Sequence, residues 1–265
     1  MASYLVAAAI VAALAGCDGR GSEPPRPQPT GDAVAVDGGI ATPYGRGAGR
    51  VWVLEPTGGK VDSVVVYLHG WGAILPFEWH RVWFEHLLAR RSAVLFPEYQ
   101  DGVDDAFVVA PYDLRKGLRL GFRALGERDL PVVAAGFSVG ASLAFVYAAD
   151  AKRWSVPAPR AVYSIFPVDP LLIDPGLDVS NIRDTRVVLL VGDHDDVAGR
   201  QGGDAFWSML RSVPANEKEY RLIRTTAQLL ADHEAPTAIT DPDVRRTFWR
   251  PLDRLVARAR GDRND

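Results

Sequence analysis

Residues 136–140 read Gly-Phe-Ser-Val-Gly, a spacing that can present a nucleophilic serine on a tight turn. A short apolar run at 132–135 precedes them and an amphipathic segment follows, so Ser138 lies between an expected strand and an expected helix. Gly136 and Gly140 suit such a turn, because a Cβ at either position would meet neighbouring backbone. The pattern predicts a reactive serine beside a helix N-terminus, where negative charge is stabilised. A serine that only caps the helix is the alternative interpretation.

A serine hydroxyl is a poor nucleophile at neutral pH and requires a general base within hydrogen-bonding distance. The bases available are the histidines of the chain, His69, His80, His86, His194 and His233. Acidic residues that would orient such a base follow two expected strands, Asp169 after residues 161–166 and Asp193, Asp195 and Asp196 after residues 187–191. The histidines and acidic residues lack the spacing typical of metal ligands, and this chemistry requires neither a metal nor a cofactor.

Segments with the character of strands and helices alternate along the chain and would position these residues. Strands are expected at residues 33–36, 51–55, 63–68, 93–96, 132–135, 161–166, 187–191 and 219–224. A last helix is expected to begin at Asp241, as its N-cap, with Pro242 at its first position. We therefore expect an α/β fold, a doubly wound, mostly parallel sheet of eight strands flanked by helices, with an antiparallel strand pair at the N-terminus. Ligands bind such sheets at the carboxyl ends of the strands.

Taken together, these features resemble the α/β-hydrolase superfamily, and its serine esterases in particular. The resemblance rests on the turn at 136–140, on His69-Gly70-Trp71-Gly72, on the turn at 192–197 and on a late histidine. It spans roughly residues 51–255. Members of the superfamily order their triad along the chain as serine, acid, histidine. The resemblance implies His233 as the base, because the family places its histidine in a loop after the last strand.

The resemblance also implies the acid of the triad. The family's turn is similar to Gly-x-x-Asp-x-Val, which selects Asp195 in this sequence, with Asp196 and Asp169 as alternative acids. We therefore expect a triad of Ser138, His233 and Asp195. In such a triad the histidine takes the serine proton, and the aspartate holds the ring in the required tautomer.

Two backbone N–H groups are implied as the oxyanion hole. One belongs to Val139, just after the nucleophile, and the resemblance places the other at Trp71. The intervals from Ser138 to Asp195 and from Asp195 to His233 hold no obvious helical cap domain. This spacing predicts an open, shallow site. His80 is expected on a surface helix.

The N-terminal residues predict export. Residues 4–15 are almost wholly apolar, too few to span a bilayer, and typical of a signal peptide. The residues that end at Cys17, Leu-Ala-Gly-Cys, resemble the lipobox of bacterial lipoproteins, which implies lipidation of Cys17. Residues 18–32 are rich in proline and have little to bury, as in a disordered tether. The predicted organisation is a signal peptide at 1–17, a tether at 18–32 and one α/β-hydrolase domain at 33–265.

Composition limits the functions that are compatible with this chain. Its 265 residues, 48% of them hydrophobic, can bury one substantial core. A net charge of −3 gives no reason to expect a nucleic-acid partner, and a single cysteine excludes an intramolecular disulfide. We expect a serine hydrolase that cleaves small or surface-presented carboxylic esters in the cell envelope, held on a membrane through Cys17 or else freely secreted. An acyltransferase or peptidase would use the same triad, and a catalytically silent hydrolase-fold binding protein is the alternative from another class.

Overall fold

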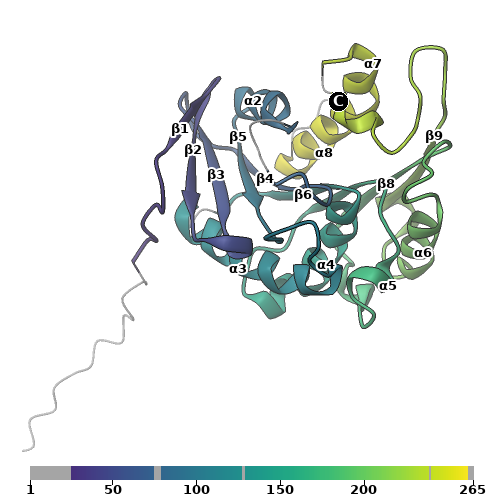
Figure 1. Ribbon diagram of the computed structural model, residues 1–265, viewed down its shortest axis with the longest axis horizontal. Helices are drawn as coiled ribbons and strands as arrows, with labels where there is room; N and C mark the ends of the chain where they lie inside the picture. The colour runs from purple at the N-terminus through teal and green to yellow at the C-terminus, as the bar shows by residue number, and fades with distance from the viewer. Residues whose placement is uncertain (1–24, 75–78, 127–128, 239, 262–265) are drawn as a thin grey trace, which may run out of the picture.

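The computed structural model describes residues 25–74, 79–126, 129–238 and 240–261 (Figure 1). The expected signal peptide, Cys17 and the first part of the expected tether lie outside the described residues. The strands are β1 (Val34–Val36), β2 (Gly39–Tyr44), β3 (Val51–Pro56), β4 (Ser63–Leu68), β5 (Ser92–Pro97), β6 (Val132–Phe137), β7 (Ala161–Ile165), β8 (Arg186–Gly192) and β9 (Lys218–Ile223). The α-helices are α2 (Arg81–Ala89), α3 (Ala110–Leu125), α4 (Val139–Trp154), α5 (Pro170–Ile173), α6 (Gln201–Met209), α7 (Pro242–Val244) and α8 (Arg250–Arg260).

The strands described by the structure form one sheet in the order β1-β2-β3-β5-β4-β6-β7-β8-β9. Neighbours from β5 to β9 are parallel, and β1, β2 and β3 are antiparallel to their neighbours. The expected class of fold is confirmed, but the expected count of eight strands is one too low. The additional strand is β2, which lies between β1 and β3, so these two strands do not pair with each other as predicted.

Helices cover both faces of this sheet. Because successive side chains of a strand point to opposite faces, β4 sends Val64, Val66 and Leu68 to one face and Val65 and Tyr67 to the other. The first face packs against α3, α4 and α6, and the second packs against α2 and α8, as the layers in Figure 1 show. Every residue of β4, β5, β6 and β7 is buried, as expected of central strands in a two-sided α/β sheet.

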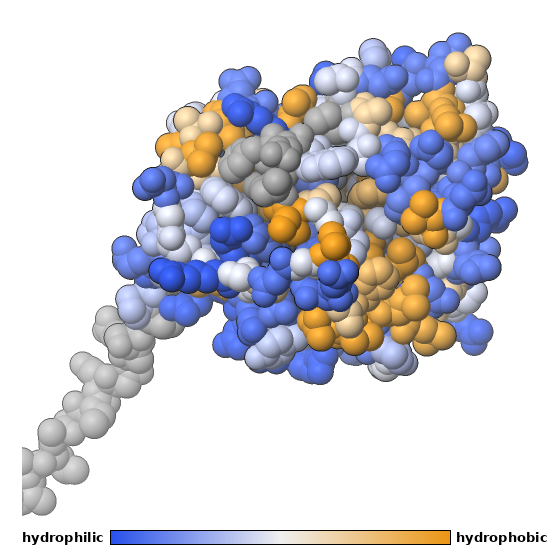
Figure 2. Space-filling view, in the orientation of Figure 1, coloured by the Kyte–Doolittle hydropathy of each residue, from blue (hydrophilic) through white to orange (hydrophobic). Residues whose placement is uncertain are grey.

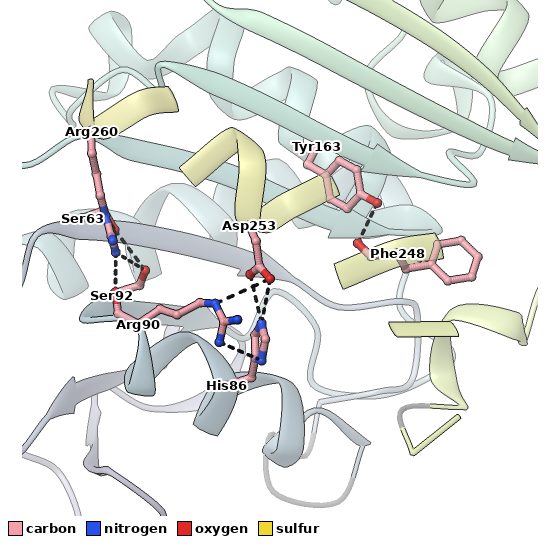
Figure 3. A network of polar contacts seen from close by, with 8 residues as sticks. All are labelled: Ser63, His86, Arg90, Ser92, Tyr163, Phe248, Asp253 and Arg260. Atoms are coloured by element: carbon pink, nitrogen blue, oxygen red, sulfur yellow. Dashed lines mark hydrogen bonds and ion pairs between the residues drawn. The ribbon is translucent and has the colours of Figure 1, made fainter. Parts of the chain in front are cut away.

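The C-terminal helix is fixed to the sheet by polar contacts as well as by apolar packing. Arg260 donates hydrogen bonds to the hydroxyls of Ser63 and Ser92, the first residues of β4 and β5, at 2.9 and 3.0 Å (Figure 3). Asp253 accepts a hydrogen bond of 3.0 Å from the His86 ring on α2. The C-terminal end of α8 therefore lies at the amino ends of the parallel strands, away from their carboxyl ends.

The start of this C-terminal segment agrees with the sequence. The Asp241 carboxylate accepts hydrogen bonds from the backbone N–H groups of Asp243 and Val244, at 2.7 and 3.3 Å, which confirms it as an N-cap. A π-helical turn (Arg245–Trp249) separates α7 from α8, and Pro251 lies in the first turn of α8. The helix is thus reorganised just before the proline, which has no N–H to donate.

The segment that precedes β1 is hydrogen-bonded to the domain. Thr30, within the predicted tether, donates from its backbone N–H to the Pro43 carbonyl at 2.9 Å and from its hydroxyl to the Gly45 carbonyl at 2.8 Å. The Pro25 carbonyl also accepts a hydrogen bond of 3.0 Å from the Arg123 guanidinium on α3, so the described part of the predicted tether contacts the domain from Pro25 onward. Among the described residues, no helix has the length and apolar character needed to cross a membrane.

Candidate active site

Ser138 occupies a strained position between β6 and α4. Its backbone has φ 57° and ψ −124°, a conformation that non-glycine residues rarely adopt. Strained backbone conformations of this kind cluster at functional sites. Close approach explains the flanking glycines: a Cβ on Gly136 would lie 2.2 Å from the Gly140 carbonyl oxygen, and one on Gly140 would lie 2.2 Å from the Leu68 carbonyl oxygen. The turn thus exists only because these positions lack side chains, as the sequence predicts.

A continuous chain of hydrogen bonds links three residues from separate loops. His233 Nε2 lies 2.9 Å from Ser138 Oγ, and His233 Nδ1 lies 3.0 Å from each carboxylate oxygen of Asp195. All three residues are buried, with exposed fractions of 6–7%. The contact with Asp195 requires a proton on Nδ1, which leaves Nε2 as the acceptor for the Ser138 hydroxyl. The structure therefore brings together the three residues of the predicted triad.

The Asp195 carboxylate is held in its charged form. Burial by itself would raise the pKa of this group. The hydrogen bond from His233 and the backbone N–H groups of Ala198 and Val197, at 2.9 and 3.0 Å from Oδ1, outweigh burial. As a result the pKa of Asp195 lies below its usual value, and an anion faces the imidazole at neutral pH.

The other aspartates take different positions. Asp196 is exposed, and Asp169 caps α5 by accepting a hydrogen bond of 2.9 Å from the Leu171 N–H. Asp193 accepts hydrogen bonds of 2.9 Å from the backbone N–H and hydroxyl of Thr225, and the bond from His194 lowers the pKa of Asp193 to about 2. Among these groups only Asp195 hydrogen-bonds His233, so the alternative acids Asp169 and Asp196 do not have the geometry of the third triad member.

The loop after β4, which carries Trp71, is fastened by the segment that follows β5. The Gly72 N–H donates to Gln100 Oε1 at 2.8 Å, and Trp71 Nε1 donates to the Val103 carbonyl at 2.9 Å. The Tyr99 hydroxyl donates to the His69 carbonyl. Gln100 itself is held by donating to the Gly102 carbonyl at 2.9 Å. These bonds fix the backbone of the loop that the resemblance associates with the oxyanion hole.

Two buried histidines lie beside this loop. His69 is fully buried and stacks on Tyr99, with ring centroids 4.1 Å apart. Burial lowers its pKa to about 4, although its hydrogen bond with the Gly70 carbonyl opposes the shift. Burial and the charge of His69 lower the pKa of His80 to about 3, against a hydrogen bond with the Ala73 backbone. The prediction that His80 lies on a surface is wrong, since it is 4% exposed.

Sequence reasoning did not identify Gln100 or His80 as part of the site. Gln100 meets Gly72 across 28 positions of sequence, and no motif marks a glutamine for that contact. His80 lies at the N-terminus of α2, where the ring turns into the core among Tyr67, Phe84 and Phe96. The only signal in the sequence for the burial of His80 is the set of apolar residues that follows it, which predicts that one face of the helix is buried.

Ser138 faces a cavity of about 700 Å³. The residues that line it are mainly apolar or small: Gly70, Trp71, Gly72, Ala73, Trp79, His80, Phe107, Phe137, Ser138, Val139, Val168, Asp169, Leu172, Val197, Ala198, Gln201, Gly202, His233, Glu234 and Thr237. Trp71 and Val139, the predicted oxyanion residues, thus face the same space as the serine and the histidine. The cavity can hold an apolar group next to Ser138.

Comparison with known proteins locates the chain among solved structures. No protein-family model matches it, and no curated protein matches it. Three of its structural neighbours are esterase B from Lactobacillus rhamnosis, an esterase from the bacterial hormone-sensitive lipase family, and Thermogutta terrifontis esterase 2 phosphorylated by paraoxon. Their identities to this chain are 17%, 16% and 15%, and their TM-scores are 0.61, 0.60 and 0.58. The alignments cover 80%, 84% and 84% of this chain and 81%, 86% and 95% of the neighbours.

These likenesses, together with the strand order and the turn at Ser138, show the fold. The chain has the α/β-hydrolase fold, with the antiparallel N-terminal strands and the flanking helices described above.

Proposed function

We propose that this protein is a serine hydrolase that cleaves carboxylic esters through an acyl-enzyme, with Ser138, His233 and Asp195 as its catalytic triad. The observation that carries the proposal is the unbroken set of hydrogen bonds from Ser138 Oγ through His233 to Asp195, at 2.9 and 3.0 Å. A structural role does not require a serine with positive φ, a buried imidazole and a buried carboxylate in this order. A hydrolase requires all three.

The acylation step follows from this geometry. Ser138 Oγ attacks the carbonyl carbon of the ester, and His233 Nε2 accepts the hydroxyl proton. Asp195 stabilises the imidazolium that results and keeps the Nδ1 proton in place. When the tetrahedral intermediate collapses, the bond from carbon to the alcohol oxygen breaks, and His233 donates its proton to that oxygen.

The deacylation step reverses these roles with water. His233 takes a proton from a water molecule, whose oxygen attacks the acyl carbon, and then returns the proton to Ser138 as the carboxylic acid leaves. In both steps the N–H groups of Val139 and Trp71 bind the negative oxygen. Loss of one such donor costs roughly 10²–10³ in rate, so the bonds that hold the Trp71 loop matter to turnover.

The structural neighbours support an ester as the substrate. One neighbour is phosphorylated by paraoxon, and another structure of esterase B is inhibited by a tributyrin phosphonate. Both of those proteins are esterases that react with or are inhibited by organophosphorus compounds. We extend this reactivity to Ser138 of the present chain as part of the proposal.

The test is covalent labelling with a fluorophosphonate, followed by peptide mass spectrometry of the full chain. We expect one adduct, on Ser138, and no adduct in Ser138→Ala or His233→Ala. Ser142→Ala is the matched control, because Ser142 lies one helical turn away and its hydroxyl donates to the Val168 carbonyl at 2.8 Å. That variant should label as the wild type does.

The alternatives give different results in the same experiment. A folded wild type that does not label supports a catalytically silent binding protein and refutes the proposal. A labelled protein that transfers acyl groups to added alcohols faster than to water, or that cleaves peptides, would support the catalytic triad. It would contradict ester hydrolysis as the function.

We also propose that the chain is exported and anchored to a membrane through lipidated Cys17. The lipobox-like residues that end at Cys17 support this proposal. Stable anchoring takes more than one acyl chain, which a multiply acylated cysteine supplies. Cys17→Ser should release the protein from the membrane fraction, and unchanged retention would contradict lipidation.

A further inference from the structure

Many of the large apolar side chains that the structure leaves exposed lie at or beside one feature, the cavity over Ser138. Leu172, Val197 and Trp79 line this cavity and are nevertheless 52%, 74% and 47% exposed. Solvent-exposed side chains on the wall of a cavity mark its mouth. A soluble protein rarely leaves such side chains in contact with water unless they serve binding.

The apolar surface continues outward from these three residues. Leu171 precedes Leu172 on α5 and is 64% exposed. The 3-10 turn η2 (Phe107–Val109) contacts α5 and contributes Val108, which is 54% exposed, beside Phe107 of the cavity wall. Figure 2 shows apolar side chains gathered on the visible face around α5.

Val103 extends this surface over the loop after β4. It is 68% exposed, its carbonyl accepts the hydrogen bond from Trp71 Nε1, and the Trp71 ring packs edge-on against Phe107 at 4.7 Å. We call the exposed set the apolar rim: Trp79, Val103, Val108, Leu171, Leu172 and Val197.

The charges near the rim select the kind of surface that it fits. The described residues that line the cavity include the carboxylates of Asp169 and Glu234 and no lysine or arginine. The loop that carries Val103 also holds Asp101, Asp104 and Asp105. Negative charge at this end of the molecule disfavours an anionic partner and does not oppose an uncharged apolar one.

The position of the rim also selects its occupant. A second copy of the chain or a protein partner seated on the rim would close the mouth of the cavity and block access to Ser138. The surface of a water-insoluble substrate would instead supply ester molecules to the cavity each time the rim contacts it. The occupant that fits both the charges and the position is therefore the substrate phase itself.

On the premise that the proposed ester hydrolysis is correct, we infer that the apolar rim adsorbs the enzyme onto the surface of uncharged ester lipids, with the cavity facing the lipid. The substrate class is thereby narrowed to neutral, aggregated lipid esters. The exposed arginines of α8, Arg254 and Arg258, do not take part, since the C-terminal end of α8 lies at the amino ends of the strands and the cavity lies at their carboxyl ends.

The first experiment measures contact with lipid without catalysis. In the full chain with Ser138→Ala and Cys17→Ser, a single cysteine is introduced by Val108→Cys and labelled with a polarity-sensitive fluorophore. Ile40→Cys is the matched control, because Ile40 is also exposed, at 44%, but lies on β2. Trioctanoin droplets coated with phosphatidylcholine should shift the emission at position 108 to the blue and leave position 40 unchanged, and added 0.5 M NaCl should not reverse the shift.

The second experiment measures the consequence for turnover. Val108→Ser combined with Leu171→Ser removes two rim side chains that do not line the cavity. Hydrolysis of dissolved p-nitrophenyl acetate should stay within two-fold of wild type, whereas hydrolysis of the trioctanoin droplets should fall about ten-fold. The droplet rate falls because the serine side chains do not gain the free energy that the two aliphatic side chains gain on moving from water into lipid. Ile40→Ser should leave both rates unchanged.

Distinct results overturn the inference and the proposed function. Equal emission at positions 108 and 40 with droplets, a shift at position 108 that appears without lipid as the protein concentration rises, or an unchanged droplet rate in the double variant overturns adsorption through the rim. Absence of any turnover of dissolved p-nitrophenyl acetate by the wild type overturns the ester hydrolase, and the fluorophore assay reads the rim independently of that result.

Discussion

The two buried histidines beside the loop after β4 should make the fold sensitive to acid. His69 and His80 are 0% and 4% exposed, and their pKa values are lowered to about 4 and about 3. The Nε2 atoms of both rings are buried without a hydrogen-bond partner, so a proton added there would place an uncompensated charge in the core. The unfolded chain has no such restriction and binds the proton with an ordinary pKa near 6.5.

The sign and the size of the effect follow from linkage. Because the pKa of each ring is lower in the folded state, the unfolded state binds more protons between about pH 4 and 6.5, and the free energy of unfolding decreases as the pH falls through that window. Each pH unit below 6.5 is worth about 1.4 kcal/mol per ring. At pH 5 the His69 ring alone should therefore lower the stability by about 2 kcal/mol, and His80 by a similar amount.

Urea unfolding at pH 7.5 and pH 5.0 measures this loss. In His69→Phe the aromatic ring can still stack on Tyr99 but cannot titrate, so the loss of stability between the two pH values should be about 2 kcal/mol smaller than in the wild type. His194→Gln is a control of opposite sign. The hydrogen bond with Asp193 raises the pKa of His194, so its contribution is present at low pH, and its removal should steepen the acid loss. Equal losses in the wild type and His69→Phe would refute this reasoning.

Three further substitutions test the site. Gln100→Leu removes the acceptor of the Gly72 N–H, so kcat for a dissolved ester should fall about ten-fold while KM stays within two-fold. Steady-state kinetics measures both constants. A change in KM alone would mean that the loop contributes to substrate binding and not to the chemical step. Asp195→Asn should lower kcat by about 10⁴ without loss of folded structure by circular dichroism, since His233 would adopt the wrong tautomer. Gly136→Ala places a Cβ against the backbone of Gly140 and should lower the free energy of unfolding in urea by about 3 kcal/mol; an unchanged value would contradict the close approach at this turn.

The sequence predicts most of the parallel sheet because its strands are buried on both faces and read as continuous apolar runs. It does not predict β2, whose residues Gly39–Tyr44 include glycine, threonine and proline and are alternately buried and partly exposed. Hydrogen bonds to β1 and β3 on either side determine that this segment is a strand. Pairing of this kind depends on partners rather than on the segment's own residues.

The residues of the site also differ in whether the local sequence predicts them. Ser138 is predictable because the turn, the glycines and the flanking elements are adjacent in sequence and enforce one another. The contact of Gln100 with Gly72 and the burial of His80 depend on how β4, β5 and α2 pack, which no local pattern records. The cavity likewise arises from α5, η2 and the loop after β4 meeting in space.

The central claim is that Ser138 forms a covalent acyl intermediate with the help of His233. Rapid mixing of the wild type with excess p-nitrophenyl butyrate, combined with quenched-flow mass spectrometry, measures it most directly. We predict a butyryl group on the peptide that contains Ser138, formed in step with the release of p-nitrophenol, and no such adduct in His233→Ala. Turnover of the ester with an unmodified Ser138 peptide at every time point, or acylation at another residue, would contradict the account.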